Sequence, residues 1–187
     1  SSQNVDLGPN FEFGTGNFSL QLIALLPDSV DSFPLTTRLS SGGTGYEFLF
    51  GGGATPGNVE LRFRDVGVRG GLGLTGGMND GRPHAFVRVF DEDNGSFYID
   101  GEFKGQDTRT GSLTNTQNLF LAQRGITFWT GQIGLVSIWD RALTPTEIAQ
   151  LAQDPFILSR PTAKVFAFDG PGPSSSSKSS SSSSQSS

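Results

Sequence analysis

The chain has 187 residues, a net charge of −5 and no cysteine, and 34% of its residues are hydrophobic. This length suits one β domain with a tail. The acidic balance argues against nucleic acid as a partner, the lack of cysteine excludes disulfides and thiolate metal sites, and no apolar run approaches the roughly 20 residues of a membrane helix.

Short apolar segments separated by turn residues fill the first half of the chain. Residues 18–27 predict a buried strand, and shorter strands are expected at residues 11–13, 35–39, 46–50 and 59–63. The glycine-rich residues 67–77 contain a G-x-G-x-x-G pattern, but no helix follows to receive a phosphate. We therefore interpret them as a loop or an edge strand.

Residues 85–104 predict three short strands joined by two tight turns. Asn94-Gly95 is expected to form the first turn and Asp100-Gly101 the second, because a type I′ turn needs positive φ at both central positions. A further strand is expected at residues 119–122, and residues 126–129 lead into a closing strand at residues 131–139.

A short helix is predicted after the last of these strands. Thr144 is its expected N-cap, Pro145 occupies the first helical position, and Glu147 completes a capping box. Leu143 and Ile148 stand where a hydrophobic staple would place them. A helix of about two turns is not stable alone, so we expect it to dock on an apolar sheet face.

The C-terminal part of the chain changes in composition. Residues 164–168 predict one more extended segment, and the serine-rich residues 170–187 cannot bury apolar surface. We expect a β-sandwich domain over residues 1–169 and a flexible tail or linker over residues 170–187.

The closing strand and helix resemble those of laminin-G-like, concanavalin A-like jelly-roll domains. The residues that match are Gly131, Ile133, Val136, Ile138, Trp139, Arg141, Ala142, Leu143, Thr144, Glu147 and Ile148. Gly134 and Leu135 replace an acidic pair of the family. The PFILSRP ending at residues 155–161 resembles such proteins of phage and prophage origin. The resemblance implies an all-β, antiparallel β-sandwich of the jelly-roll, concanavalin A-like type with one short C-terminal helix.

This superfamily includes glucanases, so the resemblance raises glycosidase activity as one function. A retaining glycosidase needs two carboxylates about 5 Å apart, often on an E-x-D-x-x-E strand, and the sequence has no such strand. The single histidine, His84, excludes a multi-histidine metal site. We therefore expect that the protein is not an enzyme.

Glycan binding would require exposed aromatic rings beside polar side chains. The candidates are Trp129, Tyr98 and Tyr46, with Arg124 close to Trp129 in the sequence. Trp129 is the better candidate for exposure, Tyr98 points to the face opposite its neighbours, and Trp139 is expected in the core.

A calcium site is the one metal site that the sequence suggests. Asp91, Asp93 and Asn94 supply oxygen ligands from one loop, although the same residues suit a solvated hairpin tip. We expect no cofactor, with calcium as the alternative.

Together these patterns predict a non-catalytic, surface-exposed binding or display module that recognises glycans or a partner protein. One setting is a decoration or fibre component of a phage virion, in contact with other virion proteins. The alternative is a carbohydrate-binding accessory module of a secreted polysaccharide-degrading enzyme. Either setting places the protein outside the cell or on a virion surface, with no nucleic-acid partner and no membrane insertion.

Overall fold

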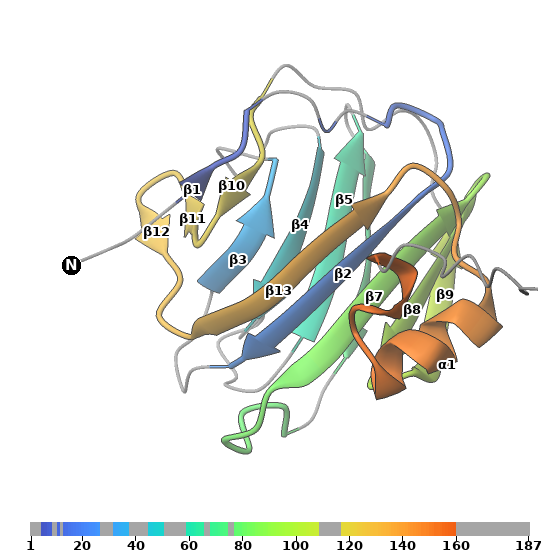
Figure 1. Ribbon diagram of the computed structural model, residues 1–187. Coiled ribbons are helices and arrows are strands. Elements are labelled where there is room, and N and C mark those ends of the chain that lie inside the picture. Colours follow the sequence, from blue (N-terminus) through green and yellow to red (C-terminus); the bar gives the residue numbers. More distant parts are fainter. Residues whose placement is uncertain are drawn as a thin grey trace, which may run out of the picture.

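A computed structural model describes residues 5–8, 11, 13–26, 32–37, 45–50, 59–65, 68–74, 77–108 and 117–159. The expected strand at residues 164–168 and the tail at residues 170–187 lie outside the described residues. Within them, two antiparallel sheets pack face to face as a β-sandwich with one short α-helix (Figure 1). The predicted all-β fold class is confirmed. No helix among the described residues has the length and apolar character to cross a membrane.

The sandwich has a six-stranded and a five-stranded sheet. The six-stranded sheet has the order β1 (Val5–Asp6), β10 (Phe120–Leu121), β3 (Ser32–Thr36), β4 (Gly45–Phe50), β5 (Val59–Asp65) and β6 (Val68–Leu74). The five-stranded sheet has the order β13 (Gln132–Trp139), β2 (Phe18–Leu25), β7 (His84–Asp91), β8 (Asn94–Ile99) and β9 (Glu102–Thr108). A small hairpin of β11 (Gln123–Arg124) and β12 (Thr127–Phe128) lies against β3.

Aromatic side chains fill the space between the two sheets. Every second residue of β2 faces inward and meets inward residues of β4 and β7, because successive side chains of a strand alternate between faces. The rings of Phe18 and Phe90 stack with centroids 4.6 Å apart, and those of Phe50 and Phe86 lie 5.0 Å apart. The phenylalanine-rich composition therefore supplies the main core.

The helix α1 (Pro145–Gln153) covers the outer face of the five-stranded sheet (Figure 1). Its predicted N-cap and capping box, Thr144 and Glu147, are both present, and Ile148 and Leu151 are buried against β7 and β8. The Ser19 hydroxyl on β2 holds the segment between β13 and α1, because it donates to Arg141 O and accepts from Leu143 N, both at 2.9 Å. The 3-10 helix η2 (Ile157–Ser159) follows.

Two of the expected local features are wrong. The first strand is β1 rather than residues 11–13. The β7–β8 turn is formed by Glu92 and Asp93, since Asp91 pairs with Asn94, so Asn94-Gly95 is not the turn. Gly95 instead leaves room for buried side chains, because a Cβ there would collide with the Arg88 guanidinium and the Asp107 carboxylate.

Two other expectations are confirmed. Asp100 and Gly101 form the β8–β9 turn with φ values of 52° and 84°, as a type I′ turn requires. The glycine-rich stretch contains β6, which is an edge strand of the six-stranded sheet.

Candidate functional site

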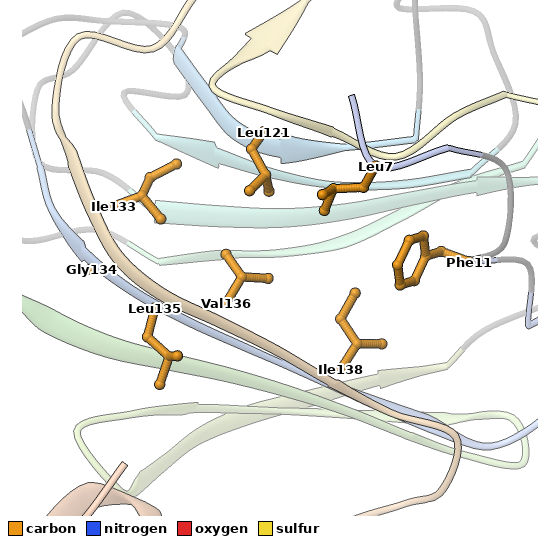
Figure 2. Close-up of a pocket in the computed structure, with 8 residues that line it drawn as sticks. All are labelled: Leu7, Phe11, Leu121, Ile133, Gly134, Leu135, Val136 and Ile138. Atoms are coloured by element: carbon orange, nitrogen blue, oxygen red, sulfur yellow. The ribbon is translucent and has the colours of Figure 1, made fainter. Parts of the chain in front are cut away.

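An open apolar groove lies on the flank of the sandwich where β13, the end strand of one sheet, faces β1 and β10 of the other (Figure 2). We name it the β13 groove. It has a volume of about 540 Å³ and is lined by Leu7, Phe11, Leu121, Ile133, Gly134, Leu135, Val136 and Ile138. The lining residues come from three distant parts of the sequence.

A β-bulge in β13 gives the groove its apolar wall. The pairing of β13 with β2 shifts between Ile133 and Leu135, which leaves Gly134 as the extra residue. After this shift Ile133, Val136 and Ile138 all pack against the main core. In a strand without a bulge, Ile133 would lie on the face opposite Val136 and Ile138. Figure 2 shows Val136 and Ile138 directed toward the groove and Leu135 directed away from it.

The outer edge of β13, opposite β2, gives the groove its hydrogen-bonding capacity. β13 pairs with β2 along one edge, and no other described strand pairs with it. Every second backbone N–H and C=O of an edge strand therefore points away from its own sheet, where a further strand can bind them. The groove offers apolar contacts and backbone hydrogen bonds, and its lining has no charged side chain.

The aromatic side chains proposed for glycan stacking are buried. Trp129 is 8% exposed, and its ring centroid lies 5.3 Å from that of Phe50. Tyr46 is 1% exposed, its hydroxyl donates to Phe11 O at 3.0 Å, and burial raises the pKa of Tyr46 above its ordinary value. The expectation that Trp129 is exposed is wrong, because the ring closes the end of the core.

Tyr98 does lie on the opposite face from its neighbours, as expected, but α1 covers that face. The ring is 9% exposed, belongs to the cluster with Ile148, and contacts the Phe103 ring edge-on at 5.5 Å. Trp139, which was expected in the core, is only partly buried, where it packs against the same cluster. A buried ring cannot stack on a sugar.

Arg124 holds the β11–β12 hairpin onto the six-stranded sheet. Its guanidinium lies 3.6 Å from the centroid of the Phe33 ring, and Nη1 lies 3.3 Å from Oε2 of the fully buried Glu47. An arginine in this position compensates a buried carboxylate. The structure thus brings none of the four glycan candidates to the β13 groove.

The exposed aromatic side chains and the groove are not among the features predicted from the sequence. Phe103 is 57% exposed on β9, Phe156 is 54% exposed after α1, and Phe128 is 38% exposed on β12. The position of Phe103 after a type I′ turn on an edge strand is a signal that could have indicated its exposure. The groove has no comparable local signal, because it depends on the bulge and on segments distant in sequence.

The residues proposed for calcium form the tip of the β7–β8 hairpin. Asp91 Oδ1 accepts a hydrogen bond from Asn17 Nδ2 at 2.8 Å, and Asn17 Oδ1 accepts from Glu92 N at 2.7 Å. Asp93 and Asn94 are exposed beside it. Across the described ranges, no group of three or more His, Cys, Asp or Glu side chains is placed to hold a metal ion. Calcium binding stays a prediction.

Comparison with known proteins identifies the family and supports the fold. A family model for the concanavalin A-like lectin/glucanases superfamily matches residues 1–149. The fold is similar to domain 4 of AbnA, a GH43 extracellular arabinanase from Geobacillus stearothermophilus, in complex with arabinotriose, with a TM-score of 0.61, 14% identity, and coverage of 80% of this chain and 72% of that chain. A search of curated proteins finds no match.

Two toxin domains have a similar fold. The botulinum neurotoxin serotype G binding domain gives a TM-score of 0.56 and 14% identity, with coverage of 80% of this chain and 39% of that chain. The botulinum neurotoxin DC binding domain in complex with rat synaptotagmin II gives a TM-score of 0.58 and 8% identity, with coverage of 74% of this chain and 36% of that chain. The chain thus spans less than half the length of these toxin domains.

Proposed function

The chain belongs to the concanavalin A-like lectin/glucanases superfamily, and from this premise we propose that it is a non-catalytic binding module that holds an extended apolar segment of a partner protein in the β13 groove. The observation that carries the proposal is the combination of an edge of β13 with which no described strand pairs and an adjoining apolar groove. Adding a strand to an exposed sheet edge is a general mode of peptide recognition, in which the backbone gives affinity and alternate side chains enter pockets.

The lining favours a protein segment over a sugar in this groove. Sugar hydroxyls lose their water on binding and need hydrogen-bonding side chains in return, and the groove lining provides only apolar side chains. A peptide backbone can satisfy its own polar groups along β13, while its apolar side chains pack on Leu121, Val136 and Ile138. The lack of charge in the lining implies affinity with little dependence on salt.

The described carboxylates support a non-catalytic role. Glu47 and Asp107, which are largely shielded from solvent, each pair with an arginine, Arg124 and Arg88 respectively. The carboxylates of Asp80 and Asp100 approach each other only across the ring of His84. A glycosidase instead needs a carboxylate pair that flanks a space for the sugar.

Glycan binding is the second candidate function. It is supported by the fold similarity to an arabinanase domain that was solved with arabinotriose, and by the exposed ring of Phe103, which the Tyr98 ring holds edge-on. An exposed ring held in a fixed orientation is a surface on which a sugar face can stack. This candidate uses a different surface from the β13 groove, so one experiment can separate the two.

The test combines a peptide selection with two matched variants. Leu7 is 39% exposed at the groove, and Ile126 is 95% exposed at the tip of the β11–β12 hairpin, outside the groove. Peptides selected from a displayed random library on the full chain are expected to carry alternating apolar residues. Leu7→Glu should weaken their binding in titration calorimetry at least about tenfold, a difference of about 1.4 kcal/mol, and Ile126→Glu should leave it unchanged.

A glycan array, run in calcium and again in EDTA, tests the second candidate. Glycan binding that Phe103→Ala abolishes and Leu7→Glu preserves, together with a failed peptide selection, would replace the first proposal by the second. Peptide binding equally weakened by Leu7→Glu and Ile126→Glu would also refute the groove as the site.

The setting of the module is part of the same proposal. We propose either a virion surface or a secreted polysaccharide-degrading enzyme as this setting, and the composition of the serine-rich residues 170–187 suits a linker in either. Neighbouring capsid or tail genes would favour the virion, and a glycoside hydrolase in the same reading frame would favour the accessory module.

A further inference from the structure

The single histidine of the chain, His84, lies between two carboxylates at the start of β7. Its Nδ1 is 2.7 Å from Oδ2 of Asp100, which belongs to the β8–β9 turn. Its Nε2 is 3.1 Å from Oδ1 of Asp80, which belongs to the loop of residues 77–83. The His84 side chain is 13% exposed, so the ring is held largely within the protein.

These two contacts define the protonation state of the ring. An ionised carboxylate only accepts hydrogen bonds, so each ring nitrogen must carry a proton, and both nitrogens are protonated only in the imidazolium form. Burial by itself would lower the pKa of His84, but the hydrogen bonds to Asp100 and Asp80 and their negative charges outweigh it and raise the pKa above 6.5.

Among the described residues, Asp100 and Asp80 are the charged groups that act directly on the pKa of His84. On the neighbouring strand β2, the uncharged Ala24 pairs with His84. On the loop, the Arg82 backbone N–H donates to Asp80 Oδ1 at 2.9 Å, and the Arg82 charge acts on Asp80. On the side that faces α1, the β8–β9 turn carries Gly101. This glycine lies beside the helix backbone and the Ala152 side chain, which are uncharged.

The two carboxylates are anchored unequally. Asp100 Oδ1 accepts from Ala85 N at 2.8 Å, and Asp100 N donates to Ala85 O at 2.8 Å, so its position does not depend on the histidine. Asp80 is bonded within its own loop and is 42% exposed. A neutral His84 therefore keeps the Nδ1 proton for Asp100 and loses the Nε2 proton, which leaves a lone pair facing the Asp80 carboxylate.

We propose that His84 is a pH-operated latch, which ties the loop of residues 77–83 to the β8–β9 turn as an imidazolium and releases the loop when Nε2 loses its proton to water. The direction follows from the raised pKa: the latch is closed below the ordinary histidine value of 6.5 and opens as the pH rises through the higher value in the folded protein. The inference does not depend on the proposed ligand of the β13 groove.

Nuclear magnetic resonance of the full chain tests the latch, and the single histidine needs no assignment by mutation. Titration from about pH 5 to about pH 9 is expected to give a His84 pKa above 6.5. At pH values above the pKa of His84, the tautomer with the proton on Nδ1 should dominate. The hydrogen-exchange protection of the Arg82 amide, corrected for intrinsic rates, should fall over the same pH range because that amide is bonded to Asp80.

Two aspartate variants complete the test. Asp80→Asn should shift the His84 pKa back toward 6.5 and remove the pH dependence of Arg82 protection. Asp93→Asn changes an exposed carboxylate in the β7–β8 turn and should alter neither. A wild-type pKa at or below 6.5, a dominant Nε2–H tautomer above it, or Arg82 protection that is constant through the titration would each overturn the proposal.

Discussion

The capping box of α1 contains a carboxylate whose contribution to stability can be measured directly. Glu147 accepts hydrogen bonds from Arg141 Nη2 at 2.6 Å and Nη1 at 3.0 Å, and from Thr144 N at 2.8 Å. The Arg141 hydrogen bond, followed by the Thr144 backbone bond, lowers the pKa of Glu147 from 4.5 to about 2. Glu147→Gln removes the charge, and the glutamine oxygen can still accept from Thr144 N.

The expected loss is about 1 kcal/mol. A carboxyl group with this lowered pKa would contribute about 3 kcal/mol to the free energy of unfolding at neutral pH if no solvent screened it. The side chains of Glu147 and Arg141 are 24% and 48% exposed, however, and exposed ion pairs contribute only about 0.2–1 kcal/mol. The interaction of the Glu147 charge with the N-terminus of α1 adds roughly a few tenths of a kcal/mol to the contribution of the ion pair.

The pH dependence distinguishes this charge from other effects of the substitution. Because folding lowers the pKa of Glu147, its stabilisation is complete above the unfolded value of 4.5 and is lost as the pH falls toward about 2. Urea unfolding of wild type and Glu147→Gln should therefore differ by about 1 kcal/mol at pH 7 and converge near pH 2. A difference that stays constant across this range would refute the electrostatic account.

Three further substitutions should each lower the free energy of unfolding measured in urea at pH 7. Trp129→Ala should cost about 3–5 kcal/mol, because the ring belongs to the core. Arg124→Met should cost about 3 kcal/mol, because it leaves the buried Glu47 carboxylate without this guanidinium. Gly101→Ala should cost more than Gly81→Ala: both have positive φ, but only at Gly101 would the new Cβ lie 2.7 Å from a side chain of α1.

Features that depend on neighbouring residues in the sequence could be predicted. The N-cap Thr144 and the capping-box residue Glu147 are three residues apart, and the Asp100-Gly101 turn depends on its own backbone preferences, so both were predicted in detail. The β7–β8 turn lies two residues before the predicted Asn94-Gly95. Asn17, more than seventy positions away, binds Asp91 and the Glu92 backbone, and this contact favours a turn at Glu92 and Asp93.

The exposure of aromatic rings could not be predicted in the same way. Alternation shows that Tyr98 faces away from Phe97, but it does not show that α1 covers that side. For Trp129 the sequence indicates a loop, whereas the ring turns inward and packs against Phe50. The β13 groove depends on the bulge at Gly134 and on contacts with segments distant in sequence, so residue order alone does not reveal it.

The charges inside the sandwich favour β13 over the opposite flank as the site of the proposed apolar partner. Arg88 is fully buried in the interior, pairs with Asp107 of β9, and lies 4.8 Å from the centroid of the Phe90 ring. Burial lowers the pKa of Arg88, and Asp107 opposes this, so the ion pair must remain intact for the interior to hold a charge. A segment that entered at β9 would have to disturb this pair. At β13 the same interior ends in Ile133, Val136 and Ile138, which an apolar side chain can contact without displacing a hydrogen bond.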